Sequence, residues 1–543
     1  MHSSFGSGDD LTTPAISALI RPAVVRLSAT VIRCECAYRR LACLLVSAQR
    51  PNPVSHSFMV PGVLSFHQSL TNSFACHKTM QHGAGSLWNI LIADSNGSNA
   101  FLSSADSHIA RADVSRSSIL GGRAEELRGR SVVILTTDQL TTALALFELD
   151  GIACRMVICP NDSSIEHLPF VIAATNADAM ISDRPGLPAS SLPIPRYVPQ
   201  SHTGQPRCHE RCSPHPTEWI TFTSGTTGPP KLVVHTLPSL AGAILAGERP
   251  TQKIVWGTLY DIRRFGGLQV FLRATLSGSS LVLSSPSESI ASYLARAGSL
   301  GVTHISGTPS QWRRVLMSGS ASLITPEYIR LSGEIADQPI LNQLRSAYPQ
   351  AAISHAFGSS EAGTAFEVKD GAAGFSASLI GCGPNVEMKI EDQTLRVRSP
   401  WTATRYQGIG APALKDVDGF VDTGDLVDLR DGRYYFVGRR DGRINVGGLK
   451  VHPEEVEATL NLHPAVQMSL VRAKRNAVIG SIVVADVVLT PPAQSESRTS
   501  QALEDDILQF CRQSLPPHKV PALIRFVPSL DIAASGKMIR TRA

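Results

Sequence analysis

The chain has 543 residues, 43% hydrophobic and 17% charged, so it is too long for one compact core and has an ordinary globular composition. Its net charge of +5 is concentrated at the start: residues 1–80 hold seven Lys/Arg and three Asp/Glu, which leaves 43 basic and 42 acidic residues elsewhere. The rest of the chain is therefore nearly neutral, which disfavours a nucleic-acid-binding function.

Residues 1–80 are rich in Ser, Arg and Pro, with six arginines and one acidic residue between positions 11 and 50. This composition predicts a disordered extension or a targeting tail, and a later start at Met59 or Met80 is an alternative. The longest apolar run of the tail, Leu41–Ala48, is shorter than the roughly 20 residues of a membrane helix, so no membrane span is expected. Ten cysteines without a regular framework indicate a reducing compartment, and we expect a cytoplasmic protein.

From residue 131 onward, short apolar runs alternate with helical patterns. The runs lie at 132–135, 156–158 and 179–181, and helical patterns lie at 139–149 and 165–176. Strands buried on both faces and separated by helices predict an α/β fold with a doubly wound, mostly parallel sheet. A Pro-rich connection then follows at 184–217, a second α/β unit is expected at about 224–349, β-rich segments at 380–435, and a small α+β domain after 441.

A loop of hydroxyls and glycines follows the apolar run 219–222 and ends in a lysine. It contains Thr223, Ser224, Gly225, Thr226, Thr227, Gly228, Pro229, Pro230 and Lys231. Small residues let backbone N–H groups approach a polyphosphate, the hydroxyls add donors, and the lysine adds a point charge. The glycine and lysine spacing does not fit a Walker-type loop. Taken alone, the segment is equally consistent with a polar surface turn.

Further motifs follow in a fixed order. They are Phe357-Gly358-Ser359-Ser360-Glu361, Thr423-Gly424-Asp425, Gly438-Arg439-Arg440-Asp441, Gly447-Gly448-Leu449-Lys450 and Ser535-Gly536-Lys537. Together with the hydroxyl loop, these segments resemble the signature motifs of the adenylate-forming superfamily, which includes acyl-CoA synthetases, peptide-synthetase adenylation domains and luciferases. The resemblance covers the chain from about residue 125 to its end.

This resemblance implies a particular domain organisation. A large N-terminal AMP-binding domain of doubly wound sheets with a small β-rich subdomain is expected at 81–440. A small, mobile α+β domain is expected at 441–543, with Asp441 as the hinge.

The resemblance also implies roles for single residues. The loop from Thr223 to Lys231 grips the ATP phosphates, Glu361 coordinates Mg²⁺, and Asp425 with Arg439 holds the ribose. The segment Gly333-Glu334 and the residues Phe357, Gly358, Ser359 and Ser360 complete the nucleotide site. Lys537 contacts the α-phosphate, so that Lys537, Thr223 and Glu361 are the candidate catalytic residues, and Gly447-Gly448 lines a thiol tunnel.

Three departures from the family pattern are visible. Leu232 replaces a glycine after the loop lysine, Ser360 replaces a threonine while keeping the hydroxyl, and Asn445 stands where many members carry a lysine. None removes one of the main charged groups, so we expect an active enzyme.

The resemblance favours an AMP-forming acid–CoA ligase that uses ATP, Mg²⁺, CoA and a small carboxylic acid. Alternatives are an enzyme that loads an acyl carrier protein, an amide-forming ligase and a non-enzymatic binding module. The acid pocket is expected among residues that core packing would explain equally well: Trp256, Tyr260, Phe265, Gly267, Ser306 and Thr308.

Overall fold

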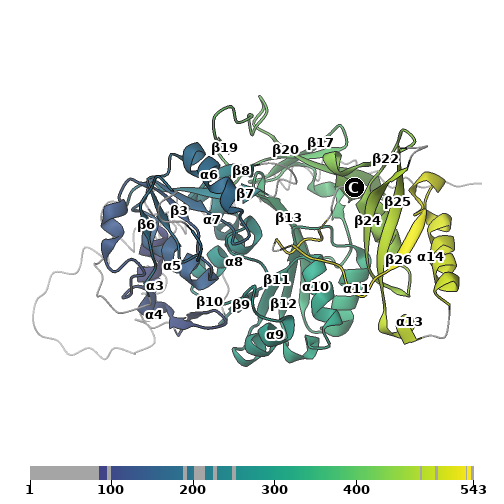
Figure 1. The fold of residues 1–543 in the computed structure, drawn as a ribbon, viewed down its shortest axis with the longest axis horizontal. Coiled ribbons are helices and arrows are strands. Elements are labelled where there is room, and N and C mark those ends of the chain that lie inside the picture. Colours follow the sequence, from purple (N-terminus) through teal and green to yellow (C-terminus); the bar gives the residue numbers. More distant parts are fainter. Residues whose placement is uncertain are drawn as a thin grey trace, which may run out of the picture. The chain divides into compact units, whose positions relative to one another are not determined.

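The computed structural model describes residues 85–94, 99–187, 192–200, 214–223, 229–247, 252–476, 480–495, 499–533 and 535–539 (Figure 1). The tail predicted at 1–80 and loop residues Ser224, Gly225, Thr226, Thr227 and Gly228 lie outside these ranges. Among the described residues, no helix combines the length and apolarity that a bilayer crossing requires.

The first sheet has seven strands in the order β19-β8-β7-β4-β3-β5-β6. Its strands are β3 (Ser131–Ile134), β4 (Arg155–Ile158), β5 (Ala179–Ile181), β6 (Arg196–Tyr197), β7 (Glu218–Thr223), β8 (Lys231–Thr236) and β19 (Arg405–Gln407). Strands β3 to β7 are parallel, whereas β8 and β19 add antiparallel pairs at one edge. Helices α3 (Leu87–Asp94), α5 (Gln139–Leu149) and α6 (Leu168–Thr175) accompany this sheet.

Both faces of this sheet are apolar, as the continuous runs predicted. Val132 and Ile134 of β3 pack into one core cluster with α5, whereas Val133 and Leu135 pack into another with α6. Because successive side chains of a strand point to opposite faces, a strand covered on both sides must be apolar throughout. The predicted doubly wound α/β fold is confirmed.

The second sheet has eight strands in the order β14-β13-β12-β11-β9-β10-β1-β2. They are β1 (Phe101–Ser103), β2 (His108–Ala110), β9 (Val255–Thr258), β10 (Ser280–Leu283), β11 (His304–Gly307), β12 (Tyr328–Ser332), β13 (Ala352–Ser359) and β14 (Gly363–Val368). The accompanying helices are α4 (Arg111–Val114), α7 (Leu237–Leu245), α8 (Phe265–Leu276), α9 (Ile290–Ser299), α10 (Pro309–Met317) and α11 (Gln338–Ala347).

The two faces of this second sheet differ in the helices that cover them. Helices α9, α10 and α11 share a core cluster with alternate residues of β11 and β12, including Ile305, Ile329 and Leu331. Helix α8 belongs to the other cluster, which also contains α5 and residues of the first sheet. Helix α8 therefore covers the face of the second sheet that carries the intervening residues of β12.

A third sheet of six strands corresponds to the predicted β-rich segments, in the order β15-β21-β20-β18-β17-β16. Its strands are β15 (Phe375–Ser376), β16 (Gly381–Cys382), β17 (Glu387–Glu391), β18 (Thr394–Arg398), β20 (Val421–Arg430) and β21 (Arg433–Arg439).

The last part of the described chain has its own apolar core. It is built from β22 (Ile444–Val446), β23 (Leu449–Val451), α12 (Pro453–Leu460), β24 (Val466–Asn476), β25 (Gly480–Leu489), α13 (Pro491–Ser495), α14 (Ser500–Ser514) and β26 (Leu523–Phe526).

Short 3₁₀ turns occur along the described chain at η1 (Arg123–Leu127), η2 (Ile165–His167), η3 (Ala321–Leu323), η4 (Ala377–Leu379), η5 (Arg440–Gly442) and η6 (Pro517–Lys519).

Candidate active site

The ends of the predicted phosphate loop are held by two paired strands. Thr223 ends β7 and lies directly opposite Lys231, the first residue of β8, in an antiparallel pair. Residues 224–228 between them lie outside the described residues, so the phosphate-binding roles of this loop stay predictions. The departure at Leu232 has a packing explanation, because its side chain is buried next to Phe222 in the apolar core.

A tyrosine that the sequence did not single out connects the loop lysine to Glu361. The ammonium of Lys231 lies 5.6 Å from the centre of the Tyr406 ring, a cation–π distance. The Tyr406 hydroxyl donates to Glu361 Oε1 at 3.3 Å. Burial and the neighbouring Glu361 raise the pKa of Tyr406, so the phenol stays protonated and remains a donor to the carboxylate. Strand β19 thus places Tyr406 between two predicted phosphate-site residues.

The segment around Gly358 joins two antiparallel strands at close range. A Cβ at Gly358 would lie 2.9 Å from Gly363 O, so only glycine fits between β13 and β14 here. The Phe357 ring stacks on Phe436 at 4.9 Å. The Ser359 hydroxyl accepts from the Ala362 backbone N–H at 3.0 Å.

The carbonyl of Ser360, next to Glu361, is held by a buried histidine. It accepts from His235 Nε2 at 2.7 Å. Burial lowers the pKa of His235 to about 4, so the ring is neutral and serves as a structural donor. The nucleotide-binding roles of Phe357, Gly358, Ser359 and Ser360 stay predictions.

The Thr423-Gly424-Asp425 segment forms a local turn within β20. Gly424 has φ +69°, a conformation that favours glycine, and the Thr423 hydroxyl accepts from the Asp425 N–H at 3.1 Å. Arg439 of the neighbouring strand donates to Thr423 O at 2.9 Å and lies 3.8 Å from Asp425. Asp425 and Arg439 therefore lie side by side, as two residues that bind the same ribose would have to.

The C-terminal lysine reaches the same region although 112 positions separate it from Asp425 in the sequence. A Cβ placed on Gly333 would lie 3.7 Å from Lys537 Cε, and Gly333 itself has φ +85°. The positive φ therefore explains glycine at 333, and the stem of the lysine lies at van der Waals distance from this position. Gly333 and Lys537, two separate sequence predictions, are neighbours in the structure.

Two hydrogen bonds to backbone groups hold the Lys537 loop in place. Thr308, the N-cap of α10, donates its hydroxyl to Gly536 O at 2.5 Å. Glu334 accepts from Met538 N at 3.1 Å with one carboxylate oxygen and from Ser310 N at 3.0 Å with the other. Glu334 therefore joins the loop to the start of α10, a role that sequence reasoning missed because it requires contacts across 204 positions. Its predicted place near the adenine stays untested.

Opposing charges surround the Lys537 ammonium. Burial lowers the pKa of Lys537, Glu334 opposes that shift, and Arg439 reinforces it. Burial also raises the pKa of Asp425, against the influence of Arg439 and Lys537. The opposite charges that the protein places near Lys537 and Asp425 therefore do not fully offset the effect of burial on their pKa values. A triphosphate would supply the missing negative charge beside the lysine.

The predicted hinge and tunnel residues lie outside this cluster. Asp441 is in the 3₁₀ turn η5, and Gly447 and Gly448 form the two-residue turn between β22 and β23, with φ +56° and +89°. Positive φ at both positions is typical of tight hairpin turns and explains the glycine pair. Both glycines are solvent-exposed. The structure thus places Lys537, and not the glycine turn, at the candidate site.

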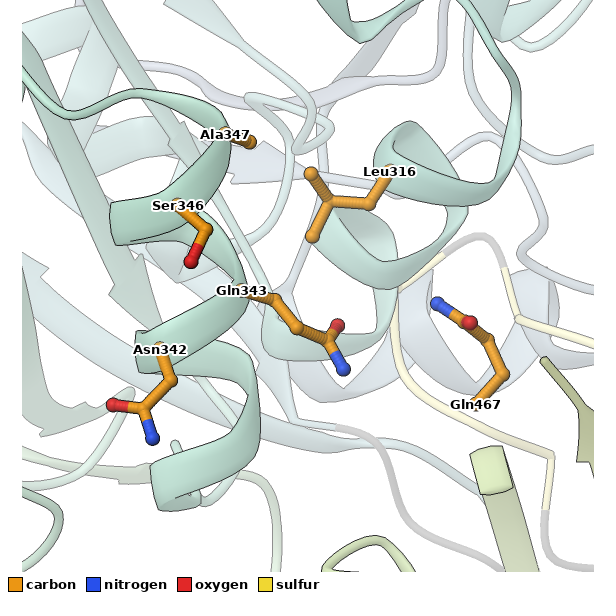
Figure 2. A pocket seen from close by; sticks show the side chains of 6 residues that line it. All are labelled: Leu316, Asn342, Gln343, Ser346, Ala347 and Gln467. Atoms are coloured by element: carbon orange, nitrogen blue, oxygen red, sulfur yellow. The ribbon is translucent and has the colours of Figure 1, made fainter. Parts of the chain in front are cut away.

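A second contact between the small domain and the larger one lies near the start of α11. Asn461 donates to Asp337 Oδ2 at 3.1 Å, and Asp337 also pairs with Arg313 at 2.6 Å. Figure 2 shows a nearby hollow, with the side chain of Gln343 directed toward Gln467. Leu316, Asn342, Ser346 and Ala347 complete its lining, and it contains none of the predicted site residues.

Residues suggested for the acid pocket have different surroundings in the structure. Gly267 is explained by packing, because a Cβ there would lie 2.2 Å from Asp261 O. Trp256 and Ser306 lie on the face of the second sheet that α8 covers. Tyr260 donates its hydroxyl to Ser332 O at 2.8 Å, at the end of β12 next to Gly333.

Comparisons with known proteins identify the family of this chain. Residues 131–403 match the model of the AMP-binding enzyme family, and residues 455–537 match the AMP-binding enzyme C-terminal domain. A 2-succinylbenzoate–CoA ligase of Bacillus velezensis is 25% identical over 437 residues, covering 77% of this chain and 82% of that protein. The mitochondrial acyl-coenzyme A synthetase ACSM3 of Mus musculus is 24% identical and covers 76% of this chain and 75% of that protein.

The fold agrees with a solved structure as well. The anthranilate CoA ligase AuaEII, in complex with anthranoyl-AMP, superposes with a TM-score of 0.70 at 20% identity, over 84% of this chain and 95% of that one. The AMP-binding enzyme model alone spans just over half of the 543 residues. The chain therefore belongs to the AMP-binding enzyme family.

Proposed function

We propose that this protein is an AMP-forming acid–CoA ligase. The observation that carries the proposal is the position of Lys537 against Gly333, with Glu334, Asp425 and Arg439 close enough to change its pKa. Because this lysine comes from the far end of the chain, its arrival among the nucleotide motifs assembles one site from both domains. The named relatives, which are CoA ligases, support the same chemistry.

In the first half-reaction a carboxylate oxygen of the acid attacks the α-phosphorus of ATP. An oxygen–phosphorus bond forms, the bond to the β-phosphate oxygen breaks, and pyrophosphate leaves with the electron pair. Lys537 is proposed to stabilise the negative charge on the α-phosphate oxygens, and Lys231 with the loop from Thr223 holds the departing phosphates. Asp425 and Arg439 fix the ribose, so that the α-phosphate meets the acid in line.

The residues present suit Mg²⁺ bound mainly through the nucleotide. Among the described residues, no group of three or more His, Cys, Asp or Glu side chains could hold a metal alone. Glu361 offers a carboxylate beside Tyr406, and Mg²⁺ commonly combines one or two carboxylates with substrate phosphates. When bound there, the ion would neutralise charge on the triphosphate, while Glu361 would provide the protein ligand.

In the second half-reaction the sulfur of CoA attacks the acyl carbon, the thiol proton is lost, and AMP leaves. We propose that the small domain first turns about Asp441, which removes Lys537 and brings the Gly447-Gly448 turn to the site. Exposure of that turn in the present arrangement supports this order. A hinge of one or two residues is sufficient for such a motion.

We also propose the reducing, cytoplasmic environment expected from the cysteines. Cys154, Cys159 and Cys511 are free thiols. Burial raises the pKa of Cys159 to about 12 and that of Cys511 to about 11, which keeps both thiols protonated and poorly reactive.

The test of function is ATP–pyrophosphate exchange over a panel of carboxylic acids, followed by product analysis with CoA, a holo acyl carrier protein or an amine as acceptor. Exchange with thioester formation on CoA is expected. Preferential loading of the carrier protein or formation of an amide would assign one of the other ligase functions. Nucleotide binding without exchange for any acid would leave a binding module and overturn the proposal.

The ribose role of Asp425 gives a separate prediction. Asp425→Ala should weaken ATP affinity about ten- to a hundredfold, because a hydrogen bond to a charged acceptor contributes about 1.5–3 kcal/mol. The affinity for the acid should change much less. The measurement is the apparent affinity for each substrate in pyrophosphate exchange.

The matched control for Asp425→Ala is Asp428→Ala. Asp428 is an aspartate of the same strand whose side chain is 51% exposed and pairs with Arg430. It should leave ATP affinity unchanged. An unchanged ATP affinity in Asp425→Ala would remove this residue from the ribose site.

A further inference from the structure

The face of the second sheet beneath α8 is polar in its interior. Register pairs place Ser306 beside Arg330 and Arg330 beside Ser354, while Glu367 pairs with Ala356 on the edge strand. The opposite face of the same strands carries the apolar residues that pack against α9, α10 and α11. Buried strand faces are normally apolar, so charged groups in this position call for a specific explanation.

Two arginines come from the elements that enclose this face, namely β12 and α8. Arg330 of β12 is 6% exposed, and Arg273 comes from the last turn of α8. Burial and the like charge of Arg330 lower the pKa of Arg273 to about 10, so Arg273 still carries a charge at neutral pH. Two like charges held together in the interior repel each other unless an anion lies between them.

The protein supplies only part of that negative charge. Glu367 Oε1 lies 3.5 Å from Arg330 Nε and also accepts from Ser354 at 2.6 Å and from Tyr328. Although burial raises the pKa of Glu367, Arg330 and these two hydroxyls hold it below its ordinary value, so the carboxylate is ionised. One carboxylate thus faces two guanidinium groups.

Hydrogen bonding is incomplete as well. Within the described part of the chain, Nε of Arg273 and Nε of Arg330 are both buried without a hydrogen-bond partner, and Arg273 has no ion pair. A buried donor without a partner costs about 1–3 kcal/mol, and more when it is charged. An anion with several acceptor oxygens, such as a carboxylate, would satisfy these donors, since guanidinium groups bind carboxylates in a bidentate manner.

The arginine pair lies along the same strand as the reaction centre. Ser332 follows Arg330 by two residues on the same face, about 7 Å further along β12, and is followed by Gly333, which contacts Lys537. Beside Arg330 the sheet neighbours are Ser306 and Ser354, and beside Ser332 the neighbour is Ala356. The Tyr260 hydroxyl is bonded to Ser332 O at 2.8 Å, so an acyl group that extends from Lys537 along this face passes Tyr260 before it reaches Arg330.

We propose that Arg273 and Arg330 bind a second carboxylate of the acid substrate, so that the enzyme adenylates one end of a dicarboxylic acid while the other end is held between the two guanidinium groups. This inference rests on the proposed function and specifies its substrate class. The chemistry of the adenylated end is unchanged, and Arg273 and Arg330 act by binding and orientation.

The experiment is pyrophosphate exchange by the full-length protein with matched acids. Straight-chain dicarboxylic acids from four to eight carbons and 1,3-benzenedicarboxylic acid are each compared with their monoamides, which have nearly the same size but lack the second charge. The wild type is expected to prefer the diacid about ten- to a hundredfold in kcat/KM for at least one pair, the difference expected for charged hydrogen bonds.

Arg273→Met should abolish that preference. Because both acids of a pair are measured on the same preparation, their ratio does not depend on the fraction of folded enzyme. The matched control is Arg296→Met on α9, which removes an arginine from the opposite side of the same sheet, where it pairs with Glu288 at 2.7 Å. That control should keep the wild-type ratio.

The outcomes separate this inference from the proposed function. Exchange with monoamides or monocarboxylic acids only, or an unchanged ratio in Arg273→Met, would overturn the inference and leave the ligase function intact. Absence of exchange with every acid, despite ATP binding, would overturn the ligase function itself.

Discussion

Lys537→Ala is expected to slow acyl-adenylate formation about 10²- to 10³-fold, while thioester formation from preformed acyl-AMP is retained. Removing one preorganised donor to a developing anion typically has an effect of this size. The lysine lies at the site in the arrangement described here, with its stem over Gly333, but leaves it in the proposed second step. Single-turnover adenylate formation and thioester formation from synthetic acyl-AMP measure the two steps separately.

Lys389→Ala provides the control for Lys537→Ala, since it removes a lysine of the third sheet that pairs with Glu391 at 3.0 Å. It should affect neither step. Circular dichroism would show whether Lys537→Ala unfolds the small domain. Equal slowing of both steps in a folded Lys537→Ala protein would contradict the domain rotation.

Gly448→Trp is expected to have the opposite effect, with adenylate formation retained and thioester formation reduced by about 10²-fold or more. In the present arrangement a Cβ at Gly448 meets no atom within 4 Å, so the first step should tolerate a large side chain. The proposed rotation brings this turn to the site, where an indole ring would fill the path of the thiol. A misplaced reactant can by itself cost about 10² in rate.

The Gly448→Trp substitution adds both backbone strain and side-chain volume, and a second variant is needed to distinguish their effects. Gly448 has φ +89°, where any side chain is unfavourable. Gly448→Ala carries the strain without the ring, so it should retain most thioester formation if the tunnel is real. Equal losses in the alanine and tryptophan variants would instead assign the effect to strain in the hairpin.

The sequence predicted the fold well where the signal is local. The apolar runs at 132–135 and 156–158 became buried strands because strands covered by helices on both sides need apolar residues throughout. The three-residue strands β1 and β2 were missed, since the pattern was followed only from residue 131 and such short strands have no recognisable period. Strand β1 joins the second sheet by pairing with β10, about 180 positions away, and β2 joins it by pairing with β1.

Site prediction from the sequence depends on motif order and misses contacts between distant segments. Motif order identified Lys537 and Gly333, which are neighbours in the structure. The sequence places Thr308 among residues that line the acid pocket or pack in the core, and in the structure its hydroxyl donates to Gly536 O. Arg330 was overlooked because an arginine between Ile329 and Leu331 has the alternation of a half-exposed strand. Only the packing of α8 over that face shows that its side chain is buried.

The hydrogen bonds that the small domain makes to the larger one have a consequence for the order in which substrates are accepted. Three hydrogen bonds, from Thr308 to Gly536, from Met538 to Glu334 and from Asn461 to Asp337, form only when the small domain lies as it does here. At about 1 kcal/mol each, they favour this arrangement by roughly a hundredfold. Under the proposed domain rotation, this arrangement serves the reaction of acid with ATP, and the thiol reacts only after the small domain has turned. Residues that never touch a reacting atom thus contribute to making the thiol the last substrate to enter.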